Sequence, residues 1–214
     1  METQHKPWLP EAISTSHLAL FSLTSNPSLA ADLHASLLAA ARAPDDETGR
    51  AAKARVDFAL IDAASIVSEA HLHTAVWQAQ TALGNGLQKA KSNHAEVIYR
   101  LGINNNIGDA LRTFGLTPTT THLVLIRLST PSLRVKEVLQ QMQALVPGAQ
   151  LLPLRSLGLL PNQDLNAPSI TGRQRICKAY KLQTTDQKSE LSVEESNKVE
   201  SLVVGAVAAK SIAA

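Results

Sequence analysis

The chain has 214 residues, of which 44% are hydrophobic and only 3% aromatic, so it can bury a core filled mainly by alanine, leucine and valine. Its formal charge of +2 at pH 7 is too small to indicate a general nucleic-acid binder, and a basic contact surface would have to be local. The single cysteine, Cys177, excludes an intramolecular disulfide and fits a reducing compartment, where we expect it to be a small buried hydrophobe.

Neither end of the sequence shows a pattern typical of secretion or of a membrane span. Residues 1–11 contain charges and prolines but no apolar core, which argues against a secretory signal. The apolar tail 202–214 is short and is interrupted by Lys210, so it is too brief to cross a bilayer. We therefore expect a soluble, intracellular protein without a membrane partner.

The first part of the chain alternates predicted strands with predicted helices. The strands are expected at 17–23 and 56–61, and the helices at 27–41 and 62–83. The first helix is favoured by Pro27, whose missing N–H costs nothing in a first turn, and the second is capped by Asp62 or Ser65. The charged segment 44–55 and the segment 84–94, which begins with a Gly-Asn-Gly turn, are expected to be mobile loops.

Residues 96–116 carry the most informative pattern of the chain, which predicts a strand, an asparagine turn and a short helix. Val97, Tyr99 and Leu101 alternate with polar or outward positions, which is the period of a half-buried strand. Asn104–Asn106 follow, and asparagine both tolerates a left-handed backbone and caps helix starts.

The segment 107–114 predicts a short amphipathic helix with apolar residues on one face. Asp109 lies in its first turn and Arg112 in its last, where the helix dipole favours each charge. Gly115 is expected to end the helix in a left-handed conformation. From the pattern alone this block is a well-capped structural corner, because it contains no nucleophile, metal ligand or phosphate-binding loop.

The remaining sequence predicts one more strand and two more helices. The strand at 122–128 is apolar nearly throughout, as expected for burial on both faces, and a helix follows at 133–145. The proline-containing segment 151–171 predicts an extended wrap, and 190–209 predicts a last helix with acidic residues at its start. Together these elements predict a single α/β or α+β domain spanning residues 1–214. It has a central sheet of about four strands flanked by helices, plus a C-terminal helix, and the strand pairing stays open.

Motifs for catalysis or cofactor binding are missing from the sequence. His71 and His73 lie two positions apart on a predicted helix, so they point in different directions and do not readily share a metal ion. No G-x-S-x-G turn positions a serine, no phosphate loop is complete, and no kinase element is present. We therefore expect no catalytic residues, no metal and no cofactor, and a protein that acts as a partner.

Two groups of basic residues have two interpretations. They are either a solvated surface or contacts to an RNA backbone, which such clusters bind by releasing counterions. Tyr180, beside the second group, is either a core residue or a platform for an unpaired base. The first group contains Lys89, Lys91 and Arg100, and the second contains Arg173, Arg175, Lys178 and Lys181.

Three blocks of the sequence resemble the smallest core subunit of the KEOPS (EKC) complex, the family of human TPRKB and its fungal and archaeal relatives. That family carries a strand of the type E-I-I/V-x-x-L, a run of the type N-N-N-I, and a short helix ending F/Y-G-I/L. The matching residues are Glu96, Leu101, Asn104 to Ile107, Phe114 and Gly115, with weaker matches at 176–182 and 61–67.

The resemblance implies a non-catalytic subunit that binds and regulates the small atypical kinase/ATPase of the complex, of the PRPK type, and other subunits through it. It also implies support for the threonylcarbamoyl modification of adenosine in tRNA, with tRNA as a further partner. The implied location is nucleus and cytoplasm, and fungal relatives are also linked to telomere maintenance. A stand-alone tRNA- or RNA-binding module is the alternative, and a small-molecule enzyme would require a pocket with convergent polar groups.

Within that resemblance, we expect the asparagine corner and the C-terminal helix to border the contact with the kinase. The corner is the most distinctive part of the family pattern, and the last helix has an apolar stripe that no later element covers. In the opposing interpretation the asparagines only satisfy backbone groups. The predicted contact residues are Asn104, Asn105, Asn106, Ile107, Asp109, Arg112, Phe114, Leu202 and Val203.

Overall fold

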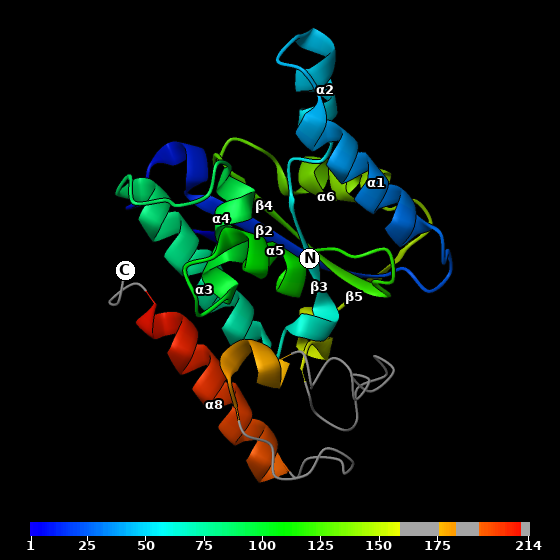
Figure 1. Cartoon of the computed structure of the whole chain (residues 1–214). Coiled ribbons are helices and arrows are strands. Elements are labelled where there is room, and N and C mark those ends of the chain that lie inside the picture. The colour runs from blue at the N-terminus through cyan, green and yellow to red at the C-terminus, as the bar shows by residue number, and fades with distance from the viewer. Residues whose placement is uncertain (159–175, 183–192, 211–214) are drawn as a thin grey trace.

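An antiparallel sheet forms the centre of the molecule (Figure 1). The computed structural model describes residues 1–158, 176–182 and 193–210, and within them the sheet has five strands. Its middle strands, β2 (Thr15–Ser22) and β4 (His122–Ser129), pair along their full length. β3 (Ala59–Asp62) covers the other edge of β4. The other edge of β2 is shared by β1 (Glu2–His5) and β5 (Gln150–Leu152).

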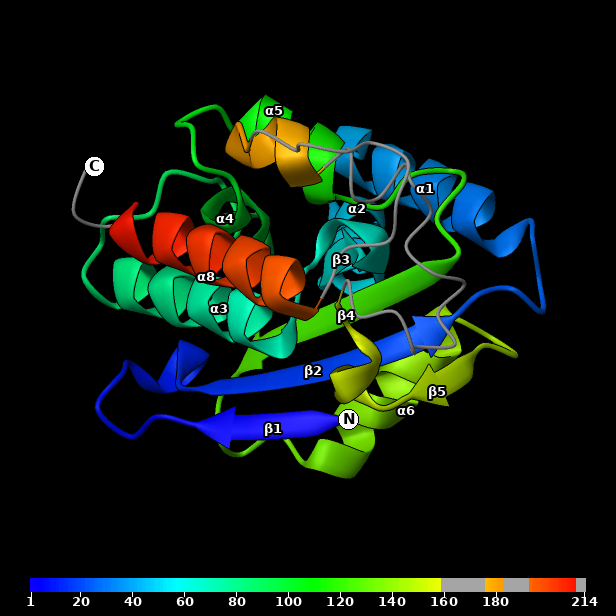
Figure 2. The same ribbon diagram turned by 90° about the horizontal axis from the view of Figure 1, so that it is seen from below.

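Helices cover both faces of the sheet, because successive strand residues point to opposite sides and both sides are apolar. Leu18 and Leu20 of β2 face one layer, whereas Ala19 and Phe21 face the other. The first layer contains α3 (Glu69–Gly84), α4 (Asn93–Leu101), α5 (Ile107–Phe114) and α8 (Val193–Ala209), seen on one side of the sheet in Figure 2. The second contains α1 (Leu29–Arg42) and α6 (Val135–Leu145). Short 3-10 helices lie at Glu11–Ile13, Ala63–Ser65 and Leu154–Ser156.

The predicted fold class is confirmed, with two differences in the strands. Because every pairing among the described strands is antiparallel, the arrangement is the α+β form of the prediction. β1 lies in an N-terminal segment for which no element was predicted, and β5 begins the segment 151–171, predicted as an extended wrap. The part of that wrap beyond residue 158 lies outside the described residues.

The strand predicted at 97–101 is wrong, since these residues belong to α4. The Ser92 hydroxyl caps the helix by accepting the backbone N–H of Ala95 at 3.1 Å. Glu96 and Arg100, one helical turn apart, form an ion pair at 2.7 Å. Val97, Tyr99 and Leu101 are buried, but so are the residues between them. Val97, Ile98 and Leu101 have the spacing of one helical face, so the sequence carries the helical period beside the alternation that predicted a strand.

The segment predicted as a loop at 44–55 contains the helix α2 (Glu47–Arg55). The Asp46 carboxylate caps it by accepting the backbone N–H of Gly49 at 2.7 Å. A glycine is needed there, because a Cβ atom at position 49 would lie 1.8 Å from the carbonyl oxygen of Pro44. In the other predicted loop, 84–94, the last two residues already belong to α4. The mobility of both segments stays a prediction.

Gly115 ends α5, but its backbone is extended, with a φ of −71°, and not left-handed as predicted. The reason for glycine here is space. A Cβ atom would lie 2.4 Å from the carbonyl oxygen of Leu111. The residue then forms an isolated antiparallel bridge with Ile61, so the end of α5 is fixed against the edge of the sheet.

Replacing Ser92 by alanine tests the helical assignment of 93–101. Ser92→Ala removes the side-chain cap of α4 and should lower the free energy of unfolding by about 1 kcal/mol. Urea denaturation measures this change. Ser36→Ala is the control, because the Ser36 hydroxyl is exposed on α1 and donates a hydrogen bond only to the carbonyl oxygen of Asp32. The free energy of unfolding should then change by less than about 0.5 kcal/mol. Equal effects of the two substitutions would contradict the cap.

Candidate functional site

Two segments distant in sequence line one groove with a volume of about 470 Å³. One wall contains residues 102–104 and α5, and the other contains Lys178, Ala179 and Lys181. Figure 2 shows the helical turn at 176–180 beside α5. The groove therefore joins residues that the sequence suggested separately, as partner contacts and as a basic group. This convergence makes it the candidate functional site.

The three asparagines of the corner have different structural roles. The Asn106 side chain caps α5 by accepting the backbone N–H of Asp109 at 3.1 Å. The Asn105 side chain accepts the hydroxyl hydrogen of Tyr99 at 2.9 Å and so ties the turn to α4. Asn104 is exposed in the groove wall, and its amide lies 3.5 Å from the Asp109 carboxylate. Asn105 and Asn106 thus fit the structural interpretation, while Asn104 is open to a partner.

Only some of the predicted contact residues offer surface. Phe114 and Val203 are 1% and 0% exposed and fill the core between the helices and the sheet, so they can only support a contact from beneath. Leu202 of α8 is 49% exposed. The Arg112 side chain is 78% exposed and pairs with Asp109 three residues earlier, and Ile107 is half-buried at the start of α5. Of the predicted contact residues on the two helices, only those on the outer face of α5 and on one side of α8 are exposed to a partner.

A buried chain of hydrogen bonds anchors the second wall. The Tyr180 hydroxyl lies 2.8 Å from Nε2 of His71 on α3 and donates to the carbonyl oxygen of Leu101 at the end of α4. Nδ1 of His71 accepts the backbone N–H of Val67 at 3.4 Å. These partners assign the neutral tautomer of His71, with its proton on Nε2 and directed at Tyr180. Burial lowers the pKa of His71 to about 3 and raises the pKa of Tyr180.

Tyr180 is therefore a core residue and not a platform for a base. Its side chain is 6% exposed, and its ring meets Phe114 edge-on with centroids 6.1 Å apart. His71 and His73 are directed to different partners, since His73 lies 3.2 Å from Glu2 of β1. Among the described residues, no group of three or more histidines, cysteines or carboxylates is placed to hold a metal ion. Cys177 is buried, as predicted.

The helical turn at 176–180 ends in a Schellman motif with an unusual residue. Leu182 N–H donates to the carbonyl of Cys177 at 2.9 Å, and Lys181 N–H donates to that of Lys178 at 3.4 Å. This pattern places Lys181 where helices usually have glycine, and its φ is +53°. A lysine in this left-handed conformation costs about 1 kcal/mol relative to glycine.

The predicted RNA-contact residues are divided by the structure. Lys178 and Lys181 are exposed in the groove, and Lys89 and Lys91 are exposed before the start of α4. Arg100 is 4% exposed and is paired with Glu96, so it is not available to an RNA backbone. Arg173 and Arg175 lie outside the described residues.

Lys210, which directly follows α8, contacts the same corner. In the sequence it was notable only because it interrupts the apolar tail. The Lys210 ammonium donates to the carbonyl oxygen of Tyr99 at 2.5 Å and lies 3.5 Å from the centroid of the Tyr99 ring. Burial and the nearby Arg100 lower the pKa of Lys210 to about 8. Tyr99 thus connects α8 with the turn that Asn105 closes.

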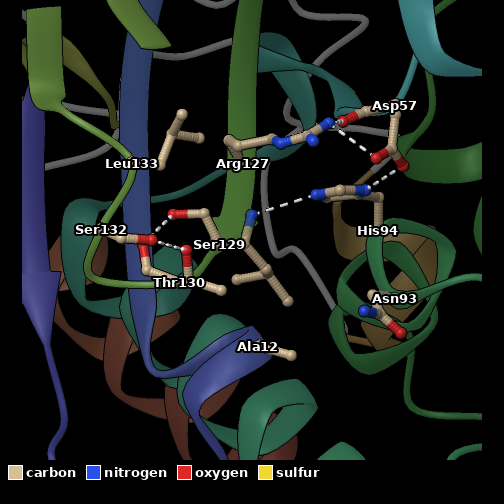
Figure 3. A pocket seen from close by; sticks show the side chains of 10 residues that line it. Ala12, Asp57, Asn93, His94, Arg127, Ser129, Thr130, Ser132 and Leu133 are labelled. Atoms are coloured by element: carbon tan, nitrogen blue, oxygen red, sulfur yellow. Dashed lines mark hydrogen bonds and ion pairs between the residues drawn. The ribbon is translucent and has the colours of Figure 1, made fainter. Parts of the chain in front are cut away.

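A second pocket, of about 430 Å³, contains an aspartate–histidine pair that resembles a catalytic base (Figure 3). Nδ1 of His94 donates to the Asp57 carboxylate at 2.8 Å, but Nε2 of His94 accepts the backbone N–H of Leu128 at 3.0 Å. Burial raises the pKa of Asp57, yet His94 and the Arg127 guanidinium, 2.7 Å away, together hold it below its usual value. Because both nitrogens of His94 are occupied, the pair holds β4 and α4 together and offers no base to a substrate.

Known proteins resemble this chain over most of its length, including both walls of the groove. A family model described as "Kinase binding protein CGI-121" matches residues 25–211. The EKC/KEOPS complex subunit cgi121 of Aspergillus fumigatus is 29% identical over 97% of this chain and 95% of its own length. The CGI121 subunits of Gibberella zeae and Coccidioides immitis are each 30% identical, over 94% and 85% of this chain and 96% and 76% of their own lengths. This chain belongs to the CGI-121 family.

The resemblance suggested by the asparagine block is thereby confirmed. Both walls of the groove lie inside the region matched to the CGI-121 family, whereas β1 and β2 precede residue 25. Sequence reasoning missed the anchors of this site, His71 and Lys210, because a buried polar residue shows its partner only in three dimensions. Within the described residues, no helix is long and apolar enough to cross a membrane.

The buried His71 should make stability depend on pH. Its pKa is about 3 when folded, against an ordinary 6.5, so between these values the unfolded chain binds a proton that the folded chain does not. The free energy of unfolding should therefore fall as the pH is lowered from about 6.5 towards 3, by at most about 1.4 kcal/mol per pH unit from this group. Urea denaturation at several pH values, for the protein and for His71→Gln, measures the slope. An unchanged slope in the variant would refute the assignment.

The three asparagines should differ in their contribution to stability. Asn106→Ala removes the cap of α5 and should cost about 1 kcal/mol. Asn105→Ala leaves the Tyr99 hydroxyl without its acceptor and should cost a similar amount, about 1 kcal/mol. Asn104→Ala, at an exposed position, should change stability by less than about 0.5 kcal/mol. Thermal unfolding of the three variants checks this order, which equal costs at all three positions would contradict.

Proposed function

We propose that this protein is a non-catalytic subunit of an EKC/KEOPS-type complex, in which it binds and regulates a small atypical kinase/ATPase of the PRPK type. The observation that carries the proposal is the match of residues 25–211 to a family described as kinase-binding. Curated relatives of similar length are named as subunits of the EKC/KEOPS complex. The occupied histidine of the Asp57–His94 pair is consistent with a role in binding rather than in catalysis.

The wider part of the proposal follows from membership of such a complex. Through the kinase, the protein would contact the other subunits and support the threonylcarbamoyl modification of adenosine in tRNA, and it would help the complex to bind tRNA. We place it in the nucleus and cytoplasm, with a link to telomere maintenance as in fungal relatives. This part rests on the family resemblance alone.

The proposed contact with the kinase includes the outer face of α5 and the exposed side of α8. Arg112 and Leu202 are well exposed, and the residues beneath them, Phe114 and Val203, are fixed in the core. Such a surface combines a charged rim with an apolar residue on a rigid support, which is typical of protein interfaces. The ends of the two helices are joined to one another through Tyr99, which bonds Asn105 and Lys210.

A stand-alone tRNA- or RNA-binding module is the second candidate function. The observation in its favour is that Lys178 and Lys181 are exposed together with Arg112 around one groove. This candidate requires salt-dependent binding of tRNA by the isolated protein, because the contacts would be to phosphates.

Co-expression with the small kinase, followed by size-exclusion chromatography with light scattering at moderate salt, tests the first function. We expect a stoichiometric complex. Arg112→Glu should raise the Kd for the kinase about tenfold, since reversing an interface charge costs about 1.4 kcal/mol or more. Arg134→Glu is the matched control, because Arg134 is equally exposed and also pairs with an acidic residue three positions away, but at the start of α6.

The outcomes separate the candidates. An unchanged Kd with Arg112→Glu would remove α5 from the interface while leaving the subunit role intact. Clean separation of the two proteins, together with tight tRNA binding by the isolated chain, would favour the second candidate. Weakening by both arginine variants alike would indicate a general charge effect and no specific contact.

A further inference from the structure

The groove beside α5 has an excess of positive charge at its rim. Among the described residues that line it, Arg112, Lys178 and Lys181 are basic and only Asp109 is acidic. That carboxylate is already paired with Arg112 and lies 3.5 Å from the Asn104 amide. Neither lysine has a carboxylate partner among the described residues. The rim therefore offers positive charge to a ligand that carries carboxylates or phosphates.

Apart from Asn104 and Thr113, the remaining described lining of the groove is apolar and mostly small. Ile103, Ala110 and Ala179 line it together with the edge of Phe114. Sites for single-stranded RNA combine positive charge with exposed aromatic rings on which bases stack. Among the described residues, Phe114 is the aromatic side chain that lines this groove, and it is only 1% exposed. A chain with both carboxylates and an apolar side chain fits the lining better than RNA does.

Lys181 adds a second, independent observation. It keeps a left-handed backbone at a position where glycine would be easier, and its side chain is thereby placed at the rim. Strained backbone of this kind persists where the surrounding structure enforces it, and it concentrates at binding and active sites. Here the enforcing contacts are the two Schellman hydrogen bonds and the buried Tyr180 next to it.

We propose that this groove is a docking site for an acidic, extended segment of the partner kinase, with an apolar side chain between Ile103 and Ala179 and carboxylates on Lys178, Lys181 and Arg112. The proposal rests on the proposed function and specifies the chemistry of the partner. In this proposal, the contact of Lys181 with the partner offsets the cost of its left-handed backbone. The charge of the rim selects the acidic segment, and the apolar floor selects a protein over a nucleic acid.

Substitution of Lys181 separates strain from contact. Lys181→Gly relieves the left-handed backbone and should raise Tm by about 2–4 °C for a chain of this size, while weakening binding of the kinase about fivefold. Lys181→Glu places a negative charge opposite the acidic segment and should weaken binding about tenfold or more. The control is Lys136→Glu, which makes the same change of charge on α6, on the far side of the sheet.

The measurements are the Kd of each variant for the purified kinase at two salt concentrations, and for deacylated tRNA in parallel. We expect kinase binding to weaken with salt, and to do so less in Lys181→Glu, because fewer ion pairs remain to be screened. A higher Tm with unchanged kinase affinity in Lys181→Gly would overturn the proposal, as would loss of tRNA affinity alone. If the protein without substitution fails to bind the kinase, the proposed function itself fails. If it binds and the lysine variants bind equally well, only the groove proposal fails.

Discussion

The Tyr180 hydroxyl joins three parts of the chain by hydrogen bonds: α3, the end of α4 and the segment 176–182. It receives a hydrogen bond from His71 on α3 and donates one to the carbonyl of Leu101, where α4 gives way to the asparagine turn. The candidate groove requires residues 176–182 to lie against α5, and this hydroxyl is one of the contacts that hold them there, beside the buried Ile176 and the contact of the Tyr180 ring with Phe114. Since the site is buried, each member must be satisfied, and a charged His71 would lose the acceptor that Val67 requires.

The same logic applies to the other buried polar groups of this layer. The fully buried Glu96 accepts the backbone N–H groups of Lys89 and Ala90, each at 2.8 Å, and pairs with Arg100. A buried ion pair adds little net stability, and both of its residues lie on α4. The two hydrogen bonds from Lys89 and Ala90 are what fix the position of α4 relative to the preceding loop. Lys210 does the same for the end of α8. The layer is therefore positioned by a few polar contacts, while the apolar residues around them supply most of the free energy of folding.

The sequence allowed a sheet flanked by helices to be predicted, because β4 is a short continuous apolar run and α1 and α6 have apolar stripes at helical spacing. The strand prediction for α4 relied on the alternation of Val97, Tyr99 and Leu101. The helical spacing of Val97, Ile98 and Leu101 is present in the same short segment, so two patterns overlap there. The sequence predicted the two walls of the groove separately, as partner contacts and as a basic group, but not that they lie together. Asn106 was identifiable as a cap from local pattern, whereas the partners of Tyr180 lie 79 and 109 residues away. Contacts at that separation leave no local signal in one sequence.

The structural and functional interpretations of the asparagine corner are compatible, because they apply to different residues. Asn105 and Asn106 use their side chains inside the protein, and in doing so they fix the backbone that presents Asn104 and α5. The opposite wall is held differently, since Lys181 is kept in an unfavourable backbone conformation by its neighbours. If this wall served stability alone, glycine would be the most favourable residue at position 181. A contact of the Lys181 ammonium with a partner, as proposed above, would offset the cost of this backbone conformation.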